Sequence, residues 1–260
     1  MIEDGAFDRG SVTTVQRVGD TIRRPVGLWT PTVHALLDHL ARTGFHGAPR
    51  VLGIDQQGRE ILSLLTGAVA RRPWPRVLHT NVGLIALIQM LQAYHTAVQS
   101  FIPPADARWF VPGLRWSPGQ IVRHGDLGPW NTIWADEQLV GLIDWDSIEP
   151  GTCLEDLAQL AWYCVPLRDD QHARAARFDT IPDRHKRLRV LCSTYGASIL
   201  EVVSVLQQLQ QREIERITNL AERGFEPWRT FRARGDSTEI AAEHAWLVQN
   251  TDTVILNSKL

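Results

Sequence analysis

The stretch HGDLGPWN at residues 124–131 is followed by the stretch LIDWD at residues 142–146. Asp126 lies in a turn-rich loop, Asn131 follows it after a step of five residues, and Asp144 ends a hydrophobic β-prone run. Phosphoryl transfer from a nucleotide needs two carboxylates and an amide placed in this way. One carboxylate accepts the proton of an attacking hydroxyl, while an amide oxygen and a second carboxylate hold Mg²⁺ against the phosphates. The pattern therefore predicts this chemistry for Asp126, Asn131 and Asp144.

The two stretches have the order and the five-residue step of the catalytic and metal-binding loops of protein kinases. They resemble more closely the aminoglycoside phosphotransferase and choline kinase-like family, whose loop reads HGD, four residues, then Asn, with a later I-D-[WF]-[DE]. A weaker resemblance in the N-terminal hairpin and in LEDLA at residues 154–158 extends over most of the chain. The resemblance implies ATP and Mg²⁺ as cofactors and Asp126 as the catalytic base. It makes Asn131 and Asp144 the metal ligands and His124 a structural residue of the loop.

Two further aspartates have open roles. Asp146 either caps the turn that follows it or contributes to the metal site. Asp156 precedes an apolar helical pattern, where an aspartate favours the positive end of the helix dipole. The family resemblance implies instead that Asp156 is a buried brace for the catalytic loop, and the sequence does not choose between these roles.

The rest of the chain has a β-rich first part and a helical last part. Two hairpin patterns at residues 12–26 and 50–65 flank an amphipathic helix pattern at 30–44. Further patterns are helical at 81–101, β-prone at 121–148 and mostly helical from about 154 to 260. With the resemblance, these patterns predict an α/β (α+β), two-lobed protein-kinase-like fold. Residues 1–66 would be a nucleotide-binding lobe with a small antiparallel sheet, and residues 67–260 a larger, mainly helical catalytic and substrate-binding lobe.

The first lobe departs from the kinase pattern because it contains no lysine to grip the phosphates. Arg23 or Arg24 must substitute, and only one can face the nucleotide because side chains alternate across a strand. We slightly favour Arg23.

The helix pattern also contains no glutamate to pair with this cation. Asp38 is its only carboxylate, and a solvent-facing Asp38 is the favoured interpretation. Gly10 and Ser11 are the only candidates for a nucleotide loop, since the chain contains no G-x-G-x-x-G motif.

Composition excludes several classes of protein. The chain has 260 residues, with 27 basic and 29 acidic side chains scattered along it, which argues against a nucleic-acid partner. The acidic N-terminal stretch and the lack of a long apolar run predict a cytoplasmic protein without membrane contact. Three cysteines are an odd count in a chain without an export signal, which predicts reduced core thiols, and Cys153 and Cys164 lack partners at metal-ligand spacing. Nine histidines without a metal-binding motif further argue against structural zinc.

We therefore expect an enzyme that transfers the γ-phosphate of ATP to a hydroxyl of a small molecule, for which an aminoglycoside is one candidate. The alternative is a catalytically weak kinase-like binding, immunity or regulatory protein. The missing lysine and glutamate favour that alternative. The intact Asp126, Asn131 and Asp144 oppose it, because a fold kept only for binding has no need of a base and two metal ligands.

Overall fold

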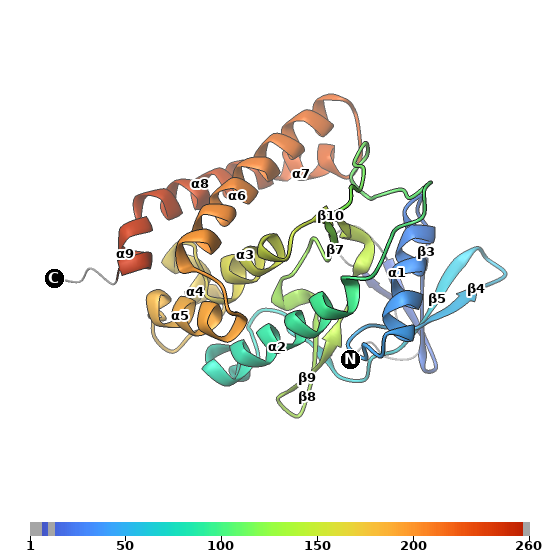
Figure 1. Cartoon of the computed structure of the whole chain (residues 1–260), viewed down its shortest axis with the longest axis horizontal. Coiled ribbons are helices and arrows are strands. Elements are labelled where there is room, and N and C mark those ends of the chain that lie inside the picture. Colours follow the sequence, from blue (N-terminus) through green and yellow to red (C-terminus); the bar gives the residue numbers. More distant parts are fainter. Residues whose placement is uncertain (1–6, 10–13, 257–260) are drawn as a thin grey trace. The chain divides into compact units, whose positions relative to one another are not determined.

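Residues 7–9 and 14–256 are described by a computed structural model of mixed α/β architecture (Figure 1). They form two units. The first unit holds the described residues up to Arg71 together with Ala86–Asp156, and the second holds Arg72–Ile85 together with the described residues from Leu157 onward. The loop at 124–131 therefore belongs to the same unit as the N-terminal strands. The functional division expected near residue 66 stays a prediction.

The N-terminal strands form a five-stranded antiparallel sheet in the order β1-β2-β3-β5-β4. They are β1 (Phe7–Arg9), β2 (Thr14–Val18), β3 (Thr21–Pro25), β4 (Val51–Ile54) and β5 (Arg59–Ser63). Both predicted hairpins are confirmed, as the pairs β2 with β3 and β4 with β5. The register of β3 on β5 sets Arg24 directly opposite Glu60. Residues opposite each other share one face of a sheet, so this pairing brings the two side chains together.

The amphipathic helix predicted after the first hairpin is α1 (Thr30–Arg42). Its apolar side chains recur at helical spacing and are at most 3% exposed: Val33, Leu36, Leu37 and Leu40. Removing each leucine side chain from water contributes roughly 1.5–3 kcal/mol. Packing of this face holds the helix against the rest of the first unit. His34 lies beside these buried residues and is half-buried.

Short strands frame the loops that carry the predicted site. They are β6 (Ala68–Val69), β8 (Thr132–Ala135) and β9 (Gln138–Leu142) in one sheet, and β7 (Ile121–Arg123) paired with β10 (Glu149–Gly151). The β-prone segments predicted at 121–148 are therefore confirmed. The loop from His124 to Asn131 connects β7 to β8, and Asp144 follows the end of β9.

Helices make up most of the second unit. They are α4 (Asp170–Ala175), α5 (Arg184–Tyr195), α6 (Ile199–Glu222), α7 (Trp228–Arg234), α8 (Asp236–Gln249) and α9 (Thr251–Leu256). Two more helices, α2 (Asn81–Val98) and α3 (Cys153–Cys164), have residues in both units. Gly196 separates α5 from α6 with φ +87°, a left-handed conformation that glycine adopts without strain.

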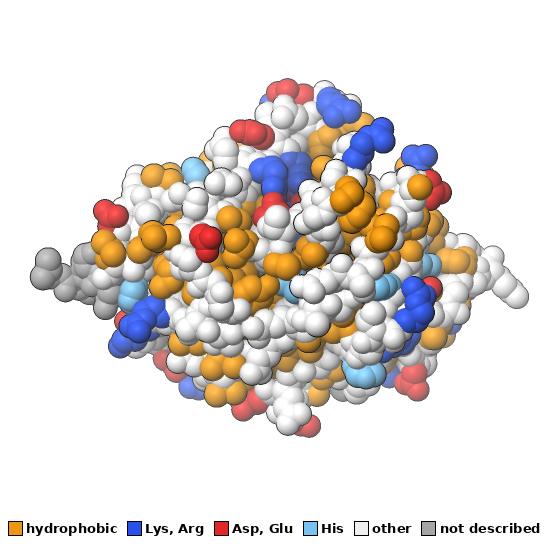
Figure 2. All heavy atoms as spheres, viewed as in Figure 1, with side chains coloured by type: hydrophobic (Ala, Val, Ile, Leu, Met, Phe, Trp, Pro, Cys, Tyr) orange, Lys and Arg blue, Asp and Glu red, His pale blue; other side chains and the backbone are white. Residues whose placement is uncertain are grey.

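Charged side chains of both signs are interspersed with hydrophobic ones on the face shown in Figure 2. Among the described helices, no single one is long and apolar enough to cross a membrane, and α5 with α6 reaches that length only across a bend of 104°. Cys164 and Cys192 are buried. Burial raises the pKa of each of these two thiols to about 12.

Candidate functional site

The loop from His124 to Asn131, named the catalytic loop here after its predicted role, holds the side chain of Asp126 in one orientation. Asn131 Nδ2 donates to Asp126 Oδ2 at 2.7 Å and to its backbone oxygen at 2.8 Å. Trp130 Nε1 donates to the same carboxylate oxygen at 3.3 Å. The short helix at Pro129–Asn131 thus brings Asn131 back to Asp126, five residues earlier in the chain. The result is a half-buried carboxylate with a fixed direction.

His124 is a structural residue of this loop, as the family resemblance implies. Its Nε2 lies 3.1 Å from the backbone oxygen of Ile143, which can only accept a hydrogen bond. Its Nδ1 must then be the acceptor for the backbone N–H of Asp126, at 3.4 Å. Burial lowers the pKa of the ring, which favours this neutral form. The ring thereby ties the loop of Asp126 to the end of β9.

Gly125 is required by the close approach of the next chain segment. Its φ is +81°, and a Cβ atom on it would lie 2.0 Å from the backbone oxygen of Ser147. Any larger residue would push the catalytic loop away from residues 144–147, which we call the Asp144 loop.

Asp144 stands where the chain leaves β9, in a left-handed conformation with φ 60° and ψ 63°. Aspartate tolerates this region better than most residues. The backbone N–H of Ile143 donates to the oxygen of Asn131 at 2.9 Å, which joins the two motifs directly. The side chain of Asp144 is 51% exposed. Its carboxylate is therefore open to solvent beside the catalytic loop.

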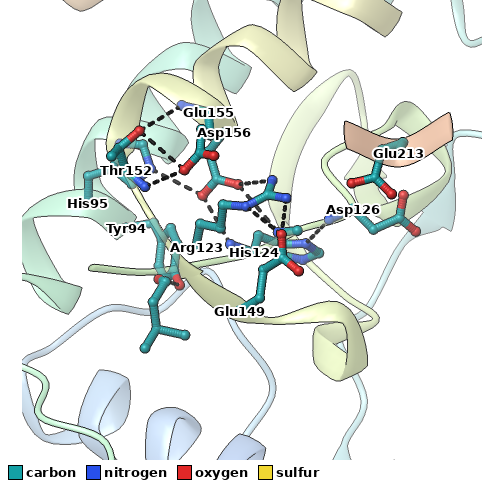
Figure 3. A network of polar contacts seen from close by, with 12 residues as sticks. Tyr94, His95, Arg123, His124, Asp126, Glu149, Thr152, Glu155, Asp156 and Glu213 are labelled. Carbon is teal, nitrogen blue, oxygen red and sulfur yellow. Dashed lines mark hydrogen bonds and ion pairs between the residues drawn. The ribbon is translucent and has the colours of Figure 1, made fainter. Parts of the chain in front are cut away.

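Asp156 braces the catalytic loop through its hydrogen bonds (Figure 3), and it also lies in the first turn of α3, where a carboxylate favours the helix dipole. Its Oδ2 accepts the backbone N–H of His124 at 3.0 Å, and its Oδ1 accepts that of Gly125 at 3.3 Å. The side chain is 0% exposed. A buried carboxylate that accepts two backbone N–H groups fixes the start of the loop more firmly than neutral hydrogen bonds would.

Further charged groups surround Asp156 within the first unit (Figure 3). His95 Nε2 lies 3.3 Å from Asp156 Oδ2. Burial disfavours the charged imidazolium, but hydrogen bonds to Asp156 and Cys153 outweigh it and raise the pKa of His95 to about 9. Arg123 Nη1 is 3.9 Å from Asp156 Oδ1, and its Nε donates to Glu149 Oε1 at 3.0 Å. Burial also works against the charge on Asp156, yet His95 and Arg123 lower its pKa overall.

Arg24, not the favoured Arg23, points toward Asp144 and Asp146. Its guanidinium is 3.0 Å from Glu60 Oε1 and 3.4 Å from Asp144 Oδ1, and it also contacts Asp146 Oδ2. Although burial lowers the pKa of Arg24, the three carboxylates outweigh it and raise the pKa. Arg23 faces the other side of the strand, as alternation predicts, and donates to Thr21 Oγ1 at 2.6 Å.

Glu60 and His34 were not identified from the sequence. Glu60 lies on β5 rather than on α1 and is 2% exposed. His34 of α1 lies with Nε2 2.7 Å from Glu60 Oε2. The carboxylate that pairs with the strand cation therefore comes from a neighbouring strand, and the helix contacts it through a histidine. Asp38 is exposed, which agrees with its favoured solvent-facing interpretation.

Asp146 serves as a partner of Arg24. Burial raises the pKa of its carboxyl to about 6, although the charge of Arg24 opposes this shift. The turn-capping and metal roles of Asp146 both stay predictions beside this ion pair. Gly10 and Ser11, the candidates for a nucleotide loop, lie outside the described residues.

The side-chain oxygens of Asn131 and Asp144 fit Mg²⁺, which prefers carboxylate and amide oxygens as ligands. Because Asn131 Nδ2 is engaged by Asp126, its Oδ1 is the atom that can face a cation. Asp144 adds a solvent-exposed carboxylate. These residues could hold the ion, with Arg24 as a neighbouring fixed positive charge.

Comparisons with known proteins agree with this geometry. Residues 108–190 match the phosphotransferase enzyme family. The trifolitoxin immunity protein of Rhizobium leguminosarum bv. trifolii is 37% identical over 205 residues, covering 76% of each chain.

Two solved structures share the fold at low sequence identity. A choline/ethanolamine kinase family protein from Mesorhizobium loti has a TM-score of 0.52 at 14% identity, covering 94% of this chain and 93% of its own. ADP-bound aminoglycoside phosphotransferase APH(2'')-Ib has a TM-score of 0.55 at 11% identity, covering 98% and 95%. The kinase-like fold predicted from the sequence is confirmed, and the chain belongs to the phosphotransferase enzyme family, with a toxin immunity protein among its relatives.

Proposed function

We propose that this protein transfers the γ-phosphate of ATP to a hydroxyl group of a small molecule. The observation that carries the proposal is the fixed carboxylate of Asp126, which Asn131 and Trp130 orient within a loop braced by Asp156. The match of residues 108–190 to the phosphotransferase enzyme family supports the same reaction class.

Asp126 would act as the general base. As the acceptor oxygen forms its bond to the γ-phosphorus, the bond from that phosphorus to the bridging oxygen breaks and ADP leaves. The hydroxyl proton passes to the carboxylate of Asp126. Mg²⁺ bound by Asn131 and Asp144 would neutralise charge on the phosphate oxygens. Because two donors already hold Asp126 Oδ2, little reorganisation is needed when the hydroxyl arrives.

Arg24 would supply the positive charge that a lysine supplies in kinases. Its guanidinium offers five N–H donors in a planar fork, more than Glu60 and Asp146 need. Its contact to Asp144 at 3.4 Å places that charge beside the proposed metal ligand. A phosphate oxygen bound there would replace part of the contact to Asp144.

The test is turnover of ATP by the full chain with Mg²⁺ and a panel of hydroxyl compounds that begins with aminoglycosides. Asp126→Asn should lower turnover by roughly 100-fold or more, the scale of general-base catalysis, while circular dichroism stays unchanged. Asp106→Asn, at an exposed aspartate outside the loop, is the matched control. Turnover by Asp126→Asn close to that of the control would remove Asp126 from the mechanism.

A second candidate function is immunity to a toxin, which the name of the 37% identical relative favours. It is compatible with catalysis if the toxin carries the accepting hydroxyl, and with simple binding if it does not. Cells sensitive to trifolitoxin that express either the wild type or Asp126→Asn would separate these cases. Protection by the wild type alone indicates immunity through phosphotransfer. Equal protection by both indicates a binding protein.

A further inference from the structure

A cluster of metal-ligating side chains lies within the second unit, apart from the residues discussed so far. His172 of α4 places Nε2 3.2 Å from Glu239 Oε1 and 3.0 Å from Glu243 Oε1. The two glutamates are four residues apart on α8, so they lie on one face of that helix. All three ligand atoms lie within 4.8 Å of one another. Within the described part of the chain, this is the only such group of three.

The ring of His172 is oriented from its other side. Asp169 Oδ1 lies 3.0 Å from His172 Nδ1 and accepts its hydrogen. A neutral ring held in this way aims the lone pair of Nε2 at the two glutamate oxygens. That arrangement repels unless a proton or a metal ion lies between them. A carboxylate on the far nitrogen is also the usual outer partner of a metal-bound histidine.

The side chain of Glu243 is buried and held in one position by its neighbours. Its side chain is 2% exposed, and Trp162 Nε1 donates to its Oε2 at 2.7 Å. Its Oε1, which faces His172, lies 2.5 Å from Arg168 Nη2 but has no hydrogen bond of good geometry. Glu239 is 63% exposed, so an ion can enter from solvent.

Charge also favours a cation here. Glu239, Glu243 and Asp169 bring three carboxylates around His172, and Arg168 is the cation in direct contact with one of them. Arg72 acts on the two glutamates from farther away. A divalent ion in place of a proton on Nε2 would neutralise the remaining charge.

We propose that His172, Glu239 and Glu243 bind a divalent transition metal ion, with Zn²⁺ as the ion that one imidazole and two carboxylates fit best. Zn²⁺ lies about 2.0–2.2 Å from nitrogen and oxygen ligands, so tetrahedral ligand atoms are about 3.4 Å apart. The distances of 3.0 and 3.2 Å need only a small expansion to reach this. A water molecule would complete the site. The ion would link α4 to α8 and stabilise the second unit.

The test is Zn²⁺ titration of the metal-stripped full chain by calorimetry, with melting temperature and Co²⁺ absorption as further readouts. Wild type should bind one ion, melt at a higher temperature with Zn²⁺ and give the intense visible bands of tetrahedral Co²⁺. Glu239→Gln and His172→Gln should weaken binding by roughly tenfold or more. Glu222→Gln, at an exposed glutamate of α6 that pairs with Arg232, is the matched control and should bind as wild type does.

Two results would overturn the proposal. Absence of Zn²⁺ binding by the wild type would mean that a protonated His172 accounts for the contacts. Binding that is unchanged in Glu239→Gln would place the ion at another histidine. Glu239 is exposed, so this variant tests the site even if His172→Gln fails to fold. None of these readouts depends on ATP turnover.

Discussion

Arg24 is the residue on which the proposed nucleotide site depends most directly. It is 7% exposed and contacts carboxylates from β5 and from the Asp144 loop. Loss of one partner of such a buried pair leaves charges uncompensated, so Arg24 stabilises the fold in addition to its proposed role in nucleotide binding. Arg23, its neighbour on the same strand, contacts Thr21 and Asp55 instead.

Arg24→Ala should weaken ATP binding by about 1.5–3 kcal/mol, the value of a charge-assisted hydrogen bond, or roughly tenfold or more in Kd. Arg23→Ala is the matched control and should change the binding free energy by only a few tenths of a kcal/mol. Isothermal titration with ATP and Mg²⁺ measures both. Wild-type ATP affinity in both variants would mean that the first unit has no phosphate anchor, and the binding-protein alternative would then be preferred.

At the scale of elements, the buried ion pair of α2 with α3 supports the catalytic loop. Burial lowers the pKa of His95 on α2, but the contacts to Asp156 and Cys153 outweigh this effect and raise the pKa to about 9. An unfolded histidine titrates near 6.5. A raised folded-state pKa stabilises the protein fully below about pH 6.5, and this contribution is lost as the pH rises through about 9. The brace therefore weakens in alkali.

His95→Gln tests this brace. The wild type should lose up to about 3 kcal/mol more unfolding free energy than His95→Gln between pH 6 and pH 9.5. Urea unfolding at the two pH values measures the difference, and the subtraction cancels the titration of groups common to both proteins. An identical pH dependence in the two proteins would mean that His95 is neutral in the folded state.

The sequence was sufficient for those parts of the site that are local in the chain. Asp126 and Asn131 are only five residues apart, so their spacing already implies their contact. Glu60 could not be assigned, because its contact to Arg24 depends on the register of β3 on β5, which hydrophobic alternation does not determine uniquely. His172 and Glu239 are 67 residues apart, so no spacing rule could find them.

At the scale of the whole molecule, nucleotide binding should appear as added stability. A ligand that binds only the folded state stabilises it by about 2.7 kcal/mol at 100 times its Kd. ATP with Mg²⁺ should therefore raise the melting temperature, and ATP with a chelator should raise it little.

Asp144→Asn should remove most of this thermal shift, because asparagine tolerates the left-handed backbone but lacks the charge that holds the ion. Asp136→Asn is the matched control, at another aspartate with positive φ in the β8–β9 turn. Differential scanning fluorimetry measures, for each variant, the melting temperature with and without ATP and Mg²⁺. The difference is compared between variants, so a change in the stability of the unliganded protein does not affect the result. A full shift in Asp144→Asn would place the nucleotide elsewhere.

An arginine in place of the strand lysine also changes which chemical reagents can detect this protein. Nucleotide probes with a reactive acyl phosphate label kinases by acylating an amine beside the bound phosphates. The guanidinium of Arg24 stays protonated and does not react as an amine does, and the chain has no lysine before Lys186. A proteome survey with such probes would therefore miss this protein even if ATP occupied the proposed site.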